Sequence, residues 1–202
     1  MHRHHEAPAA KLSPFTLDRM ERAVERVRER LERATAALDR ARIAYAVAGG
    51  HAVAAWVGRV DDSAVRNEPQ IDLLVRRDDL GRIKVAFEEE GFRHDSSSSV
   101  DLFVHGEKWE IRSAVRLIYE NESVRLGTDI RHPQLTETED IGSFRVLALS
   151  TLVRTLLADY RDVDRTHLRD LIDVGLIDES WCGRYPPELA QRLRGILETP
   201  EG

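Results

Sequence analysis

One stretch constrains the fold of this chain more than any other, because it places a strand, a glycine pair, a helix and a second strand in close succession. The run IAYAV is rich in strand-forming residues and ends at Gly49 and Gly50. The small apolar residues of HAVAAWVGRV then predict a helix that packs closely against a neighbour. After a polar loop, IDLLV predicts a short strand that carries a single acid, Asp72.

A long amphipathic helix is predicted before this segment, and another helix after it. Ser13 as a cap, Pro14 at the first helical position and apolar residues at spacings of three, four and seven predict a helix that reaches to about residue 43. Its dense charged outer face is most simply explained by solvation. A further helix is predicted from about Asp78 to Gly91, where the glycine ends it.

The second half of the chain predicts a hairpin and a helical tail. The segments VDLFVHG and WEIRSAVRLIYEN predict paired strands around Gly106, after a turn in the serine run 96–99. Residues 124–145 carry little periodicity. The tail predicts two or three helices, from TLVRTLLADYR capped by Ser150, DRTHLRDLIDVG ended by Gly175, and PPELAQRLRGILE begun by two prolines.

The composition suits one substantial core and argues against several classes of protein. The chain has 202 residues, 42% of them hydrophobic, and its net charge of −6 comes from interleaved acids and bases, with no strong nucleic-acid signal. No apolar run approaches a membrane span, and the single Cys182 suits a reducing cytoplasm. We predict an α+β fold, a mixed sheet flanked by helices, with a disordered tail at 1–12, the α/β domain at 13–145 and a C-terminal helical region at 146–202.

These motifs occur in the order known from a family of enzymes. In the polymerase-β-type nucleotidyltransferase superfamily, a strand leads to a glycine pair at a helix start, and an arginine precedes a strand with Asp-x-Asp. A helix ending in Gly-Phe and a hairpin follow. YAVAGGHAVAAW, QIDLLV and the helix that ends in EEEGF are similar to this pattern, and LVRTLLADYRDVDRTHLRDLIDVGLID is similar to the C-terminal helices. Over residues 40–180 the chain resembles small bacterial nucleotidyltransferases of the abortive-infection or toxin–antitoxin type.

The resemblance implies a site for a nucleoside triphosphate and magnesium. Acids at alternate strand positions face the same side and can bridge two ions. Asp72 would be a catalytic metal ligand, and Asp101 a second one if the strand register differs from the one we favour. A glycine pair allows phosphates to approach a helix N-terminus. The implied nucleotide-binding residues are Gly49, Gly50, His51, Arg66 and Arg161.

Several positions depart from the family pattern. Gln70 stands where the first acid belongs and offers one neutral carbonyl oxygen, and His51 stands where a serine is common. Arg116 takes the position of the third acid and would repel a metal ion. Leu156 stands where the family has a phosphate-binding lysine. These changes predict a degraded metal site, with magnesium as a cofactor only if the protein is active.

The same residues have structural explanations that stay open. Asp72 is either a remaining metal ligand or a strand acid paired with Arg66, and Arg66 either contacts phosphate or belongs to a structural ion pair. Arg161, Asp164, Arg165 and Asp170 lie at helical spacing, which is more typical of a salt-bridged helix pair than of a catalytic set. His51 and His167 suit packing or capping roles.

Three functions follow from these alternatives. The first is a pseudoenzyme, a nucleotidyltransferase-fold protein with weak or no catalysis that binds a nucleotide or a partner. The second is an active magnesium-dependent enzyme that transfers a nucleotide to an RNA, protein or small-molecule acceptor. The third is a toxin–antitoxin-like interaction subunit, in which the N-terminal helix binds a protein partner or a second copy of the chain.

Overall fold

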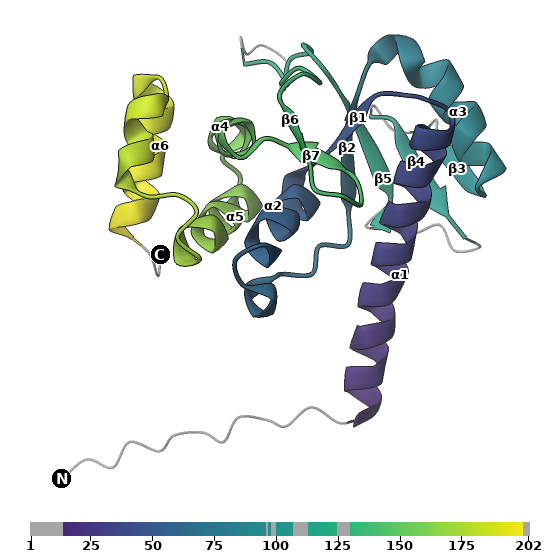
Figure 1. The fold of residues 1–202 in the computed structure, drawn as a ribbon, viewed down its shortest axis with the longest axis horizontal. Coiled ribbons are helices and arrows are strands. Elements are labelled where there is room, and N and C mark those ends of the chain that lie inside the picture. Colours follow the sequence, from purple (N-terminus) through teal and green to yellow (C-terminus); the bar gives the residue numbers. More distant parts are fainter. Residues whose placement is uncertain (1–13, 96, 98–99, 107–112, 125–129, 200–202) are drawn as a thin grey trace.

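The described strands of this protein form one mixed sheet with helices around it (Figure 1). The computed structural model describes residues 14–95, 97, 100–106, 113–124 and 130–199. The strands are β1 (Tyr45–Ala48), β2 (Ile71–Val75), β3 (Phe92–Asp95), β4 (Leu102–His105), β5 (Val115–Tyr119), β6 (Thr138–Asp140) and β7 (Arg145–Leu147). Their order across the sheet is β3-β4-β5-β2-β1-β7-β6.

Helices of very different length surround the sheet. They are α1 (Pro14–Arg40), α2 (Gly49–Gly58), α3 (Leu80–Glu89), α4 (Leu149–Asp159), α5 (Asp162–Asp173) and α6 (Pro187–Glu198), with short 3-10 turns at Asp62–Ala64, Arg77–Asp79 and Glu179–Arg184. In Figure 1, α2 and the C-terminal helices lie to one side of the strands and α3 to the other, while the lower part of α1 extends past them.

The central strand β2 positions the residues of interest. It pairs antiparallel with β1 and parallel with β5, so that Asp72 lies opposite Ala48 on one side and Arg116 on the other. Directly paired residues of neighbouring strands project from the same face of a sheet. The register therefore puts the side chains of Asp72 and Arg116 next to each other, at the end of the strand where α2 begins.

The core is continuous from the sheet into the C-terminal helices. Leu73 of β2, Val153 of α4 and Leu193 of α6 belong to one cluster of buried apolar side chains. The indole Nε1 of Trp56 donates a hydrogen bond to the carbonyl oxygen of Leu147 at 3.0 Å, which ties α2 to β7. Because these elements share one core, the C-terminal helices hold α2 in place against the sheet.

Most of the predicted elements are confirmed. The glycine pair does start α2, IDLLV forms β2, and β4 and β5 pair antiparallel. Gly91, Gly106 and Gly175 have positive φ, which suits the chain reversals predicted at these glycines. The predicted tail at 1–12, the Ser13 cap, three of the four serines at 96–99 and the part of the hairpin at 107–112 lie outside the described residues.

Other predictions were wrong or incomplete. The segment 124–145 was expected to lack periodic structure, yet it contains β6 and the start of β7. These strands have only three residues each, which is too short for a period-2 pattern to stand out. The strand β3 after Gly91 was also missed. Ser150 lies inside α4, which begins after Ala148, so it does not cap the helix.

Candidate functional site

A small polar pocket lies where β2 meets the start of α2. Its volume is about 160 Å³. The residues that line it are Gly49, Gly50, Glu68, Gln70, Asp72, Arg116, Arg161, Val163, Asp164 and His167. They come from α2, from β2 and the residues before it, from β5, and from the α4–α5 turn and α5, which are far apart in the sequence. The structure thus brings together most of the residues that the family pattern singled out.

Asp72 is held by a two-point ion pair. Nε of Arg116 donates to Oδ1 of Asp72 at 2.8 Å, and Nη2 donates to Oδ2 at 2.6 Å. The side chains are 13% exposed for Asp72 and 24% for Arg116, so water screens this pair less than a surface pair. The partner of Asp72 is therefore Arg116, and the alternative pairing with Arg66 was wrong.

Gln70 lies beside this pair rather than on the opposite face. Its amide Nε2 lies 3.4 Å from Oδ1 of Asp72, close enough for a weak hydrogen bond. The two side chains share a face because they are two positions apart in an extended segment. Glu68, two positions earlier, lines the same pocket, a residue that our reading of the sequence overlooked. The same alternation would have pointed to it.

The glycine pair is required by close packing. Gly49 has φ +58°, and a Cβ built on it would lie 2.6 Å from Oδ2 of Asp72. A Cβ on Gly50 would lie 2.7 Å from Cγ of Glu68 and 3.1 Å from Cε1 of His167. The start of α2 therefore lies too close to Asp72 and Glu68 to leave room for a side chain. Ala48 at the N-cap provides no capping side chain for the helix.

The turn between α4 and α5 supplies the far wall. Tyr160 adopts a left-handed conformation that ends α4, and Arg161 follows as the N-cap of α5. Nε of Arg161 donates to Oδ2 of Asp164 at 2.8 Å, which agrees with the predicted salt bridges within the tail. Burial lowers the pKa of His167, whose Nδ1 has no hydrogen-bond partner among the described residues. The imidazole is therefore neutral at pH 7.

Asp101 lies in a different cluster. Its carboxylate accepts hydrogen bonds from Tyr119 at 2.6 Å and Arg77 at 3.1 Å, and lies 2.8 Å from Nε2 of His94. Burial raises the pKa of Asp101, but the hydrogen bonds from Tyr119 and His94 outweigh it and lower the pKa overall. This cluster lines a neighbouring pocket of about 460 Å³. The structure does not bring Asp101 into the pocket that Asp72 lines.

Three other candidate residues also lie away from the small pocket. Arg66 pairs with Asp170, with Nε 2.7 Å from Oδ1, which is the structural alternative considered for it. Leu156 is 3% exposed and belongs to the apolar core, so this position does not face the pocket. His51 lines a separate cleft beneath α2. Of the candidate arginines, Arg116 and Arg161 line the small pocket and Arg66 does not.

The residues present do not match a two-ion magnesium site. Magnesium needs several oxygen ligands in octahedral geometry, usually with carboxylates among them. Both oxygens of Asp72 already accept from Arg116, and Gln70 directs its amide nitrogen toward the same carboxylate. Within the described part of the chain, no cluster of three or more His, Cys, Asp or Glu side chains could hold a metal ion.

The ion pair leads to a prediction about stability. We expect Arg116→Ala to lower the free energy of unfolding by about 2–3 kcal/mol, because it leaves the largely buried carboxylate of Asp72 without its cation. Arg28→Ala removes an exposed pair with Glu32 and should change stability by less than about 0.5 kcal/mol. Urea denaturation followed by circular dichroism measures both, and equal effects would show that the Asp72 pair is no stronger than a surface pair.

Comparisons with known proteins give a match among solved structures and none among protein families or curated sequences. No protein-family model matches the chain, and no curated protein matches it. Within the described residues, no helix is both long and apolar enough to span a bilayer.

Similarity is found among solved structures. The crystal structure of ANT(2'')-Ia in complex with adenylyl-2''-tobramycin matches with a TM-score of 0.52 and 17% identity, over 88% of this chain and 99% of that one. The solution structure of the antibiotic-resistance factor ANT(2'')-Ia has a TM-score of 0.49 at 15% identity, over 84% and 89% of the two chains. JHP933 from Helicobacter pylori has a TM-score of 0.44 at 17% identity, over 95% and 78%. Together with the strand order and the glycine-started helix, the first match shows that this chain has the nucleotidyltransferase-type fold.

Proposed function

We propose that this protein is a nucleotidyltransferase-fold pseudoenzyme: it binds a nucleotide or a partner at the small pocket and carries out little or no metal-dependent transfer. The two-point ion pair between Arg116 and Asp72 is the observation that supports this proposal. It occupies both oxygens of the acid that would otherwise bind metal. A guanidinium is always charged at neutral pH, so it competes with a cation for that carboxylate at every physiological pH.

The expected loss of rate is large. A tenfold change in rate corresponds to only about 1.4 kcal/mol of activation free energy. A metal ion bound to carboxylates supplies several kcal/mol of charge stabilisation in the transition state. Losing the acid at Gln70 and neutralising Asp72 should therefore slow transfer by orders of magnitude.

Nucleotide binding without metal has its own support. The start of α2 faces the pocket, and backbone N–H groups at a helix N-terminus attract phosphate. Arg116 and Arg161 line both the small pocket and its larger neighbour. If a phosphate group occupied the small pocket, the rest of the nucleotide could therefore lie in the larger neighbouring pocket. Glu68 and Asp164 oppose an anion there, so we expect modest affinity.

The test combines binding with restored chemistry. We expect ATP to bind wild-type protein equally well with magnesium and with EDTA in isothermal titration calorimetry, and α-labelled ATP to give no magnesium-dependent label transfer. Gln70→Asp combined with Arg116→Ala recreates two acids on one face and should gain measurable magnesium binding. Gln134→Asp adds a negative charge at an exposed residue that does not line the small pocket, and it serves as the control for the added charge.

Two outcomes would contradict the proposal. One is magnesium-dependent label transfer by the wild-type protein that disappears in Asp72→Asn, which would support the active enzyme. The other is wild-type magnesium binding as tight as that of the double variant, which would show that the ion pair does not block the carboxylate.

A second candidate function, binding of a protein partner through α1, is favoured by the extension of this helix past the strands (Figure 1). Removing residues 1–40 would not test it cleanly, because Ala34 and Leu38 are fully buried in the core. Charge reversal at Glu21 and Glu25, which are both exposed, leaves the core intact and is the suitable change for that test.

A further inference from the structure

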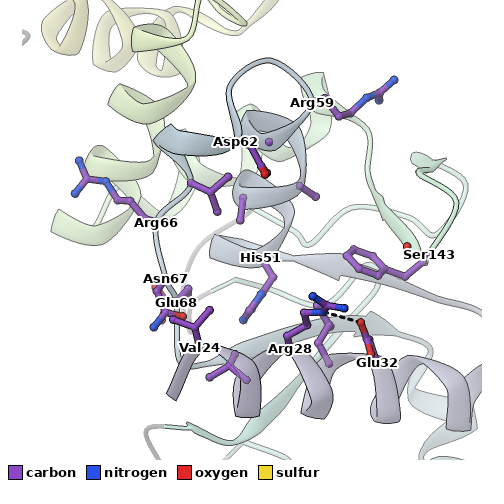
Figure 2. A pocket seen from close by; sticks show the side chains of 17 residues that line it. Val24, Arg28, Glu32, His51, Arg59, Asp62, Arg66, Asn67, Glu68 and Ser143 are labelled. Atoms are coloured by element: carbon purple, nitrogen blue, oxygen red, sulfur yellow. Dashed lines mark hydrogen bonds and ion pairs between the residues drawn. The ribbon is translucent and has the colours of Figure 1, made fainter. Parts of the chain in front are cut away.

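A third and larger cavity lies between α1 and α2. Its volume is about 610 Å³, and Figure 2 shows its side chains converging from α1, α2 and the loop that leads to β2. It shares Glu68 with the small pocket but otherwise has its own lining. A volume of roughly 300–1,000 Å³ is usual for sites that bind small molecules. Because the two linings share only Glu68, this cavity is distinct from the small pocket of the proposed function.

The cavity has a mainly apolar wall. Val24 and Val27 of α1, Ala54 and Ala55 of α2 and Val65 of the loop before β2 all line it. The side chains of Val24 and Val65 are 45% and 39% exposed, so part of this apolar lining is in contact with solvent. Apolar surface of this kind gains free energy when a ligand covers it.

Two arginines that line this cavity have acidic partners within the protein. Arg28 pairs with Glu32, and Nε of Arg66 lies 2.7 Å from Asp170. These arginines do not require an anionic ligand for neutralisation. The apolar wall and the paired arginines together favour a neutral ligand over a phosphate or carboxylate.

His51 supplies one polar atom among these apolar side chains. It hangs from the first turn of α2 toward α1 (Figure 2), and its buried Nε2 has no hydrogen-bond partner among the described residues. Burial lowers the pKa of His51, so the ring is neutral at pH 7. A hydrogen bond with the backbone of Glu68 raises the pKa of His51, which means that a ring N–H donates to the Glu68 carbonyl oxygen. Because a neutral imidazole has one donor and one acceptor nitrogen, Nε2 is left as the acceptor.

We propose that the cavity between α1 and α2 binds a neutral, largely apolar small molecule that donates one hydrogen bond to Nε2 of His51. A buried acceptor without a partner is costly, and a ligand N–H or O–H removes that cost. Among the other helices, α1 packs chiefly on α3. Because Nε2 of His51 is buried, ligand binding requires the part of α1 that lines the cavity to shift. The ligand class is thus an aromatic or aliphatic ring system with a single donor.

Indole and 1-methylindole form a matched pair of probes, because they differ in the N–H donor and have almost the same apolar surface. We expect indole to bind the full chain about tenfold more tightly than 1-methylindole, since the second probe leaves Nε2 unsatisfied. Titrations followed by protein NMR measure both affinities and identify the residues that respond. His51→Phe should reduce the ratio of the two affinities to about one, because it removes the acceptor and keeps the ring.

A surface variant protects the test against a folding defect at His51. Val65→Asp places a charge on the apolar wall and should weaken indole about tenfold, whereas Val85→Asp, on a valine 58% exposed on α3, should leave it unchanged. The proposal is wrong if neither probe binds at millimolar concentration, if the two probes bind equally to wild-type protein, or if the two valine variants have the same effect. None of these readouts depends on nucleotide binding, so failure here is distinguishable from failure of the proposed function.

Discussion

Leu156→Lys is expected to lower the free energy of unfolding by about 3–5 kcal/mol, although it introduces the residue type that the family pattern has at this position. The Leu156 side chain is 3% exposed and packs in the core that joins α4 to the sheet. A lysine there must either lose its charge or pull α4 out of place, and it also loses the apolar contacts of leucine. Thermal and urea denaturation measure the loss.

Arg154→Lys is the matched control on the same helix. Arg154 is exposed and pairs with Glu137, so a lysine keeps the charge and should change stability by less than about 0.5 kcal/mol. If Leu156→Lys were as stable as wild type and bound ATP more tightly, the side chain would have to face the phosphates. That result would support the correspondence of this position with the phosphate-binding lysine of the family.

Gly49→Ala is the second change with a large expected effect, a loss of about 3 kcal/mol in the free energy of unfolding. The left-handed φ of +58° disfavours any residue with a Cβ, and the new Cβ would lie 2.6 Å from Oδ2 of Asp72. The carboxylate must then move, which weakens its two hydrogen bonds from Arg116. We therefore expect the loss of stability to exceed the cost of placing alanine at a left-handed φ. Urea denaturation measures this loss.

Gly195→Ala provides a control of opposite sign. Gly195 lies within α6, is exposed, and would place its Cβ where no atom lies within 4 Å. Alanine there should raise the free energy of unfolding by about 1 kcal/mol, because glycine is the weaker helix former. Two glycine substitutions with the same sign would contradict the close approach of α2 to Asp72.

The elements around the pocket could be predicted because their signals are local. The apolar run of IDLLV, the glycine pair before α2 and the prolines at the start of α6 each act over a few residues. The alternation of side-chain direction along an extended strand correctly placed Gln70 and Asp72 on one face. The short strands β6 and β7 could not be predicted from their own three residues. They form because β6 pairs with β7 and β7 pairs with β1, and these contacts are between segments distant in the sequence or too short to show a pattern.

The sequence by itself determined which residues are available near the glycine turn, and that the acid expected at Gln70 is missing. Only the tertiary structure decided which partners they have. Asp72 pairs with Arg116, 44 residues away, because β2 and β5 are parallel in one particular register. Arg66 reaches α5 instead, and Leu156 turns into the core. Such contacts depend on the packing of distant segments, whereas periodicity along the chain reports only the direction of each side chain relative to its own helix or strand.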